Sequence, residues 1–393
     1  MHYLFKKTFI SLSILCASSY ALSEVRVDGF ANFTAGKVTS GEGIFGYTQD
    51  IDFENNSLFA LQLSSQVNKK VRATAQIIAR GESGYAADFE WAYLTYKHDS
   101  HNTFTAGRFR LPVFMYSASL DVGYSYHWIT APLAVYDVAF NNINGLQYNF
   151  DYYKGDFEYS LQASVGNYED EISGGVNSGK DVVLLSAQGV YQNFKSRIVL
   201  GRGVNVFQSP VLDDQIDGFT NDVANAVGGA DNVPPGVNAL ADDLRVEDDE
   251  GTFLGVGFNY DNFRWFISGE WTKVTLDDSL VANDTAYYLT SGFRSGKWTP
   301  HITFQARDGA GDIKFTDRVA SLPAPFIPGA TALNTGLQSF FFEDYTMATV
   351  GMRYDISAGV ALKGEISYYD NKIETAIAAV DTTIVNVSMN YIF

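Results

Sequence analysis

Apolar and polar residues alternate along most of the chain, and a period of two is typical of β-strands with one apolar and one polar face. Near the end, apolar side chains occupy the odd positions from Val385 to Phe393, while Asn386, Ser388 and Asn390 occupy even ones. About sixteen such stretches occur, most of them close to the 9 to 11 residues that a tilted membrane-spanning strand needs. They are residues 25–35, 57–67, 71–80, 88–97, 102–108, 145–153, 156–165, 182–192, 194–203, 252–260, 263–275, 285–293, 297–307, 345–354, 359–368 and 382–393.

The connections between these stretches alternate between short and long. The short ones are 68–69, 98–101, 154–155, 193, 261–262, 296 and 355–358. The long ones are 36–56, 81–87, 109–144, 166–181, 204–251, 276–284, 308–344 and 369–381. A soluble β-sandwich has no reason to sort its loops in this way. The pattern predicts an all-β fold, a transmembrane up-and-down antiparallel barrel with short periplasmic turns and long extracellular loops.

Composition supports a barrel over a helical membrane protein. Aromatic residues make up 15% of the chain, yet mean hydropathy is only −0.07, and no apolar run reaches the roughly 20 residues that a spanning helix needs. Many of the aromatic residues lie near predicted strand ends, as in the aromatic girdle of a membrane barrel. The net charge of −18 makes nucleic acid an unsuitable partner.

The beginning of the chain has the three parts of a secretory signal. Lys6 and Lys7 precede a short apolar run, and small residues follow before Glu24. We expect a signal peptide over 1–23 and a mature barrel domain over 24–393. Cys16, the one cysteine, lies within the signal. Acylation of this residue is the alternative to removal, but no small residue directly precedes it.

Strand periodicity also predicts which charges point into the barrel. In 71–80, apolar residues alternate with a second set that contains Arg72 and Arg80. In 25–35, the apolar set alternates with one that contains Arg26 and Asp28. We therefore expect these side chains in a water-filled lumen.

At this point the chain resembles the Gram-negative trimeric porins. The resemblance rests on the signal, the strand number, the NTFTAGRFRLP segment at 102–112 and the final strand ending on Phe393. It implies a location in the outer membrane and a homotrimer. It also implies that Tyr391 and Phe393 form the signal by which the barrel-assembly machinery recognises the chain.

In that family the loop after the fifth strand folds into the barrel and narrows the pore, and the matching segment here is 109–144. A constriction with charges of both signs on opposite walls would discriminate solutes by charge and polarity. The segment lacks the acidic Pro-Glu-Phe-Gly-Gly type sequence of enterobacterial members and carries an aromatic-rich run instead. The candidate constriction residues are Arg26, Arg72, Arg80, Arg108, Arg110, Asp121 and Asp137.

The aromatic candidates in the loop are Tyr116, Tyr124, Tyr126 and Trp128. They either pack the loop against the wall or form a track that stacks sugar rings. Packing is the preferred interpretation.

Other motifs add little chemistry. The segment 204–251 is rich in Asp and Glu, which either form a solvated acidic loop or bridge through divalent cations to lipopolysaccharide phosphates. It has no EF-hand spacing, and the histidines are not spaced as metal ligands. We therefore predict no metal site, no cofactor and no enzyme activity, although a triad assembled in space is not readable from one sequence.

The sequence therefore predicts an outer-membrane channel for passive diffusion of small hydrophilic solutes and ions. Its acidity predicts a mild preference for cations. Two alternatives stay open: a channel specific for sugars, phosphate or small acids, and a barrel whose long loops act as a receptor or adhesion surface.

Overall fold

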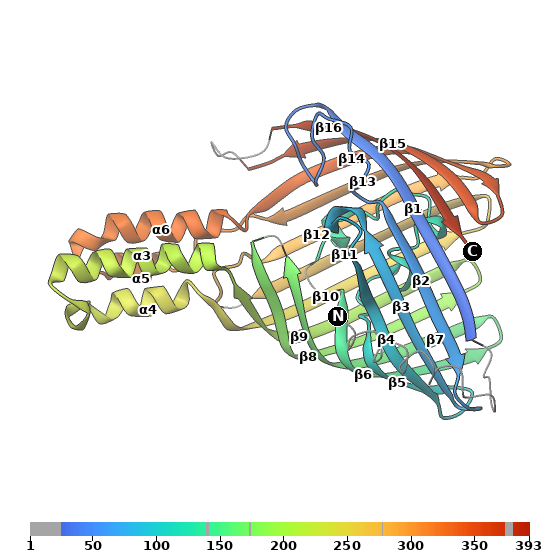
Figure 1. Cartoon of the computed structure of the whole chain (residues 1–393), viewed down its shortest axis with the longest axis horizontal. Coiled ribbons are helices and arrows are strands. Elements are labelled where there is room, and N and C mark those ends of the chain that lie inside the picture. Colours follow the sequence, from blue (N-terminus) through green and yellow to red (C-terminus); the bar gives the residue numbers. More distant parts are fainter. Residues whose placement is uncertain (1–24, 139–140, 173, 277, 374–379) are drawn as a thin grey trace, which may run out of the picture.

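The computed structural model describes residues 25–393 except 139–140, 173, 277 and 374–379, so the predicted signal and Cys16 lie outside the described residues. Sixteen antiparallel strands form one closed barrel in which each strand pairs with its neighbours in the sequence, and β1 pairs with β16 (Figure 1). Closure leaves no sheet edge, as the hydrocarbon interior of a membrane requires. The predicted fold class is confirmed.

All sixteen predicted strands are present. Their bounds are β1 Val25–Ser40, β2 Leu58–Gln66, β3 Val71–Arg80, β4 Ala87–Lys97, β5 Asn102–Arg110, β6 Asn142–Lys154, β7 Phe157–Ile172, β8 Gly175–Tyr191, β9 Phe194–Gln208, β10 Val246–Asp261, β11 Trp265–Leu276, β12 Asp284–Phe293, β13 Trp298–Gly309, β14 Glu343–Ser357, β15 Val360–Asn371 and β16 Thr382–Ile392. The segment 166–181 is not a loop as expected, because β7 and β8 continue pairing through most of it.

Two further long connections expected as loops, 204–251 and 308–344, contain α-helices. These are α3 Pro210–Val227, α4 Pro235–Asp243, α5 Thr316–Ala320 and α6 Ile327–Ser339, with a further short helix, α2 Leu133–Tyr136, elsewhere in the chain. Helices α3 to α6 extend beyond the barrel at the end opposite the carboxyl terminus (Figure 1). We call them the helical projection. None of the described helices is long and apolar enough to span a membrane.

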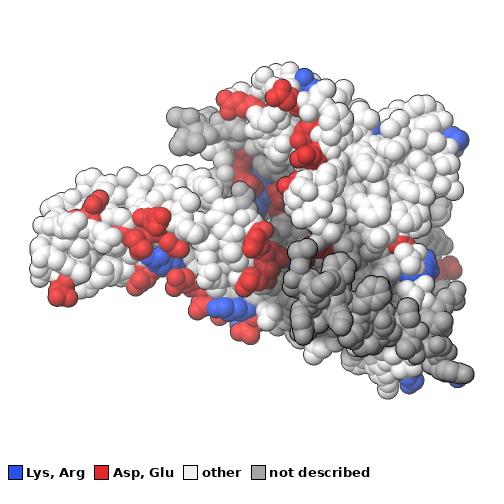
Figure 2. Space-filling view, in the orientation of Figure 1, with Lys and Arg blue, Asp and Glu red and all other residues white. Residues whose placement is uncertain are grey.

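The projection holds together because its helices share an apolar core. Leu212, Ile216 and Val223 on α3 pack with Leu240 on α4 and Leu337 on α6, and all five side chains are buried. The acidic segment 204–251 is therefore not a solvated loop: its two ends extend β9 and β10, and its middle forms α3 and α4, whose carboxylates lie largely on the outer surface (Figure 2).

Strand facing follows the predicted alternation. In β16, Val387, Met389 and Tyr391 are exposed on the outer wall, whereas Ser388 and Asn390 are buried inside. The barrel wall in Figure 2 is almost free of charged side chains. Aromatic pairs lie at the end with the short turns, for example Trp298 and Tyr354, whose ring centroids are 4.4 Å apart. This arrangement is that of a lipid-facing band with an aromatic border.

We predict that Gly145→Ala weakens the barrel next to the loop that follows β5. Gly145 faces Gly166 across β6 and β7, and a Cβ at Gly145 would lie 2.0 Å from the backbone oxygen of Val165. Overpacking against backbone costs about 1–3 kcal/mol. The free energy of unfolding should fall by that amount in urea titrations followed by tryptophan fluorescence in lipid vesicles.

Gly189→Ala is the matched control, because the nearest atom to a Cβ at Gly189 in β8 is 3.9 Å away. Equal unfolding free energies for the two variants would contradict the close approach of β6 and β7.

Candidate functional site

The chain between β5 and β6 runs inside the barrel. The segment expected to form the constriction was 109–144, but Phe109 and Arg110 still belong to β5 and residues 142–144 to β6. We call residues 111–141 the inner loop. Its base is closed by the Leu111 amide, which donates to the Asn141 carbonyl at 2.9 Å. It contains two short 3-10 turns, Ser117–Ser119 and Gly123–Ser125, and the helix α2.

Inward-facing polar residues of the opposite wall hold the inner loop. Gln305 of β13 accepts from the Ala134 amide at 2.8 Å, and Glu365 of β15 accepts from the Ile129 amide at 2.8 Å. The Trp128 indole Nε1 donates to the hydroxyl of Thr303 at 2.8 Å. Buried amides without partners would cost about 1–3 kcal/mol each, so these side chains replace the water that the loop has lost.

Glu270 of β11 is the acceptor on which three donors from two elements converge. It accepts from the Met115 amide at 2.9 Å, from the Tyr288 hydroxyl at 2.9 Å and from the Tyr136 hydroxyl. Glu270 therefore ties the two halves of the inner loop to one point on the wall.

Two cationic side chains of the same wall donate hydrogen bonds to carbonyls of the inner loop. Arg353 Nη1 donates to the carbonyls of Tyr124 and Tyr126 at 2.6 and 2.8 Å. The buried Lys363 ammonium donates to the carbonyls of Gly123 and Trp128. Positive charge that would otherwise face the lumen is thus directed at backbone oxygens.

Three of the predicted constriction residues come together in one ion cluster with a residue that the sequence analysis missed, Glu90. Arg80 contacts Glu90 at 2.9 Å and Asp121 at 3.0 Å. Arg110 contacts Glu90 at 2.8 Å and also Asp121. Burial alone would raise the pKa of the Asp121 carboxyl, but Arg110 and Arg80 outweigh that effect and hold the pKa below its ordinary value. Two guanidinium groups are therefore matched by two carboxylates.

Of the remaining candidate arginines, Arg108 borders this cluster, since its Nε donates to the Glu90 carbonyl at 3.3 Å, whereas Arg26 and Arg72 lie apart from it. Arg108 pairs with Asp170 at 3.2 Å. Arg26 pairs with Asp28 at 2.8 Å and is 75% exposed near the start of β1. Arg72, near the start of β3, lies 3.4 Å from Gln66. Arg26 and Arg72 both lie close to the short-turn end of the barrel and far along their strands from the inner loop.

Three of the four aromatic candidates of the inner loop, Tyr116, Tyr126 and Trp128, lie against one another, and Tyr124 contacts a cation of the wall. The centroids of Tyr116 and Trp128 are 5.3 Å apart, and those of Tyr126 and Trp128 are 5.8 Å apart. Trp128 and Tyr126 are buried, and Arg353 lies 4.6 Å from the centre of the Tyr124 ring. These contacts favour packing of the loop over a track of open ring faces.

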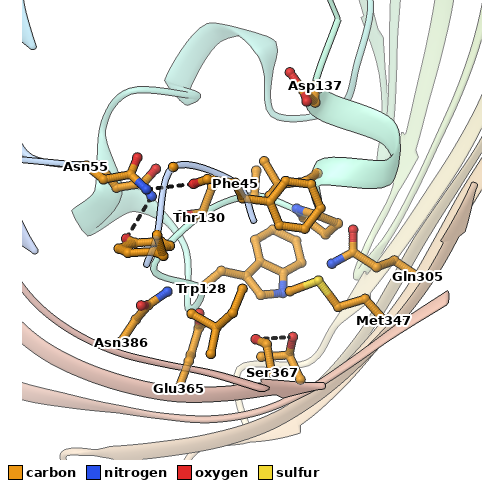
Figure 3. A pocket seen from close by; sticks show the side chains of 18 of the residues that line it. Phe45, Asn55, Trp128, Thr130, Asp137, Gln305, Met347, Glu365, Ser367 and Asn386 are labelled. Carbon is orange, nitrogen blue, oxygen red and sulfur yellow. Dashed lines mark hydrogen bonds between the residues drawn. The ribbon is translucent and has the colours of Figure 1, made fainter. Parts of the chain in front are cut away.

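A cavity of about 530 Å³ lies on the long-loop side of the inner loop (Figure 3). In Figure 3, Trp128 lies beside Met347 and Asp137 lies apart from them, where α2 ends. Its charged lining residues are all acids, and none of its described lining residues is a Lys, Arg or His. We call it the acidic cavity, and its acids are Asp52, Glu54, Glu82, Asp137 and Glu365.

A second cavity, of about 490 Å³, lies on the short-turn side of the inner loop. Its lining includes Lys195, Arg294 and Arg353 together with Asp261 and Asp355. The two sides of the loop therefore differ in charge. Within the described part of the chain, no group of three or more His, Cys, Asp or Glu side chains is arranged to hold a metal ion.

Comparison with known proteins gives one family and many solved structures. The profile of the family described as Gram-negative porin matches residues 9–374. No curated protein sequence gives a significant match.

Three of the similar solved structures illustrate the likeness. The trimer form of in-vitro folded OmpT from Vibrio cholerae is 10% identical, with 94% of this chain and 99% of that chain covered and a TM-score of 0.52. The outer membrane channel DcaP of Acinetobacter baumannii is 12% identical, with 94% and 97% covered and a TM-score of 0.55. An anion-selective porin from Comamonas acidovorans is 11% identical, with 94% and 99% covered and a TM-score of 0.55. At such identity the likeness extends to the fold alone.

We predict that Glu270→Ala loosens the inner loop and widens the passage. The change removes one acceptor shared by Met115, Tyr136 and Tyr288, and each donor left without a partner costs about 1–3 kcal/mol. Single-channel conductance in planar bilayers should rise, and larger polyethylene glycols should enter the pore.

Glu247→Ala is the control, since it removes one exposed carboxylate at the base of the projection and leaves the loop contacts intact. Conductance that is the same in both variants would show that Glu270 does not hold the loop.

Proposed function

This chain belongs to the Gram-negative porin family and is an outer-membrane channel for passive diffusion of small hydrophilic solutes, and we propose that it conducts cations in preference to anions. The family and the fold are those of a channel rather than of an enzyme. The observation that carries the proposed preference is the acidic cavity, with its five carboxylates and no base among its described lining residues. A mouth of one charge sign, walled by low-dielectric protein, concentrates counter-ions.

The arginines that could reverse this preference are matched by acids. Arg80 and Arg110 are held by Glu90 and Asp121, so the ion cluster presents little net charge to a passing solute. Arg307 is likewise held by Asp284 and Glu343. The surplus negative charge of the acidic cavity is therefore left to dominate the field on the long-loop side, which faces the exterior of the cell.

We further propose a homotrimer, supported by the fold shared with the trimer form of OmpT. Tyr391 and Phe393 are proposed as the insertion signal read by the assembly machinery. Their rings stack with centroids 5.3 Å apart and are exposed on the outer wall, where another protein could reach them. The acidic surface of the helical projection is proposed to face lipopolysaccharide. Light scattering of the detergent-solubilised protein, with the detergent mass subtracted, tests the trimer.

The cation preference predicts the sign of the reversal potential across a planar bilayer in a potassium chloride gradient. We expect the sign of a cation-selective pore at low salt. The preference should weaken as salt rises, because the Debye length falls from about 30 Å at 0.01 M to about 3 Å at 1 M. Neutralising Asp52, Glu54 and Glu82 together to Asn, Gln and Gln should move the reversal potential toward zero. An anion-selective sign for the unchanged protein would refute the proposal.

Asp121→Asn should lower the cation preference by a different route. It removes the carboxylate shared by Arg80 and Arg110 and leaves their charge only partly balanced by Glu90. Asp222→Asn makes the same change in net charge on the exposed surface of α3 and is the control. The reversal potentials of both variants, measured in the same gradient, decide the matter. A shift in Asp121→Asn no larger than in Asp222→Asn would mean that the ion cluster does not affect permeation.

A further inference from the structure

A third cavity, of about 660 Å³, differs in chemistry from the other two. It lies at the long-loop end, between the wall formed by β7 to β11, the inner loop and the chain that leaves α6. Much of its lining is apolar, including Val204 and Phe207 of β9, Leu276 of β11, and Phe340 and Phe341 after α6. We call it the apolar cavity. An apolar hollow open to a polar lumen is suited to the hydrophobic part of a ligand.

One side of the apolar cavity carries more acid than base. Arg307 contacts Asp284 at 2.6 Å and Glu343 at 2.7 Å, and all three side chains line the cavity. The second oxygen of Asp284, Oδ1, is buried and has no hydrogen-bond partner within the described part of the chain. One guanidinium thus faces two carboxylates at this position.

Asp137 adds a third carboxylate. Asp137 is exposed, and it lines both the apolar cavity and the acidic cavity. Arg307 donates to the backbone carbonyl of Asp137 at 3.4 Å, so the same cation anchors this turn of the loop. The side of the cavity near Asp137 therefore has three carboxylates and one guanidinium, and it opens toward the acidic cavity. The other base of the lining, Arg202 of β9, lies 3.8 Å from Glu250, so the lining as a whole still has more acids than bases.

We propose that the apolar cavity binds small amphipathic cations, molecules with an aliphatic or aromatic body and an ammonium group. The body would lie among the apolar side chains of β9, β11 and the segment after α6. The ammonium group would lie against Asp137, Asp284 and Glu343. An anion of the same shape would meet surplus negative charge, and a sugar would leave the apolar wall without a matching surface.

This inference rests on the proposed function in one respect, because the ligand reaches the cavity as a solute entering from the exterior. Asp137 then provides a route onward, since a cation released from the apolar cavity remains beside a carboxylate as it enters the acidic cavity.

The test is block of single-channel current by tetramethyl-, butyltrimethyl- and hexyltrimethylammonium added on the long-loop side. Affinity should rise with chain length, by up to about fourfold for each methylene if every one is fully buried (about 0.8 kcal/mol each). Hexanoate, with a similar chain and opposite charge, should block far more weakly. Block that is independent of chain length, or equal for hexanoate, overturns the proposal.

Two variants test the two halves of the site. Glu343→Gln removes one negative charge, while the ion pair between Arg307 and Asp284 remains. The affinity of the site for hexyltrimethylammonium should fall about tenfold, equivalent to about 1.4 kcal/mol. Val204→Thr puts a hydroxyl into the apolar wall with little change in size, and it should flatten the dependence on chain length. Asp222→Asn, which removes one carboxylate from the exposed surface of α3 and lines none of the three cavities, is the control and should leave the block unchanged. Unblocked conductance equal to that of the unchanged protein shows that each variant folds.

Failure of this inference is distinguishable from failure of the proposed function. If the reversal potential shows no cation preference but chain-length-dependent block persists, the apolar cavity stands and the proposed function falls. If the pore prefers cations and hexyltrimethylammonium blocks Glu343→Gln as strongly as it blocks the unchanged protein, the apolar cavity is not the binding site and the inference falls.

Discussion

Hydrogen bonding of the inner loop to the barrel wall is the constraint on which the rest of this structure depends. A loop inside a barrel loses water from its amides and carbonyls, and the wall must supply partners in its place. Glu270, Gln305 and Glu365 accept from the loop, while Arg353 and Lys363 donate to it. These five side chains come from β11, β13, β14 and β15. The loop is therefore held across the lumen, from β5 and β6 to the opposite wall, and the cavities are what remains around it.

The same pairing decides which charges a solute meets. If the lumen-facing arginines are counted without the acids that pair with them, they suggest a pore that attracts anions. In the structure, Arg80 and Arg110 contact Glu90 and Asp121, and Arg353 contacts loop carbonyls. The carboxylates of the acidic cavity lack such partners of opposite sign among its described lining residues. The electrostatic field in the pore therefore depends on which charged side chains remain without a partner of opposite charge after folding.

The helical projection shows what period-two analysis overlooks. Segment 204–251 was interpreted as an acidic loop, yet Leu212, Ile216, Phe219 and Val223 recur at helical spacing. Ser209 caps the start of α3 by accepting from the Leu212 amide, Pro210 occupies its first turn, and Gly228 ends it with a positive φ. These signals were available in the sequence. The number of acidic residues in the segment drew the interpretation toward a solvated loop.

The sequence by itself determined the strands, their order and their facing, because a strand in a membrane barrel contacts mainly its chain neighbours and alternates between lipid and water. The resemblance to the porins located the inner loop, and together with strand facing it placed Arg80, Arg110 and Asp121 among the candidates. Periodicity alone does not single out Glu90, which is the extra residue at a register shift between β3 and β4. Nor does it show that Glu270 and Lys363 hold the loop, or that Asp137 joins two cavities. Those relations connect residues up to 240 positions apart, and only closure of the barrel around the loop brings them into contact.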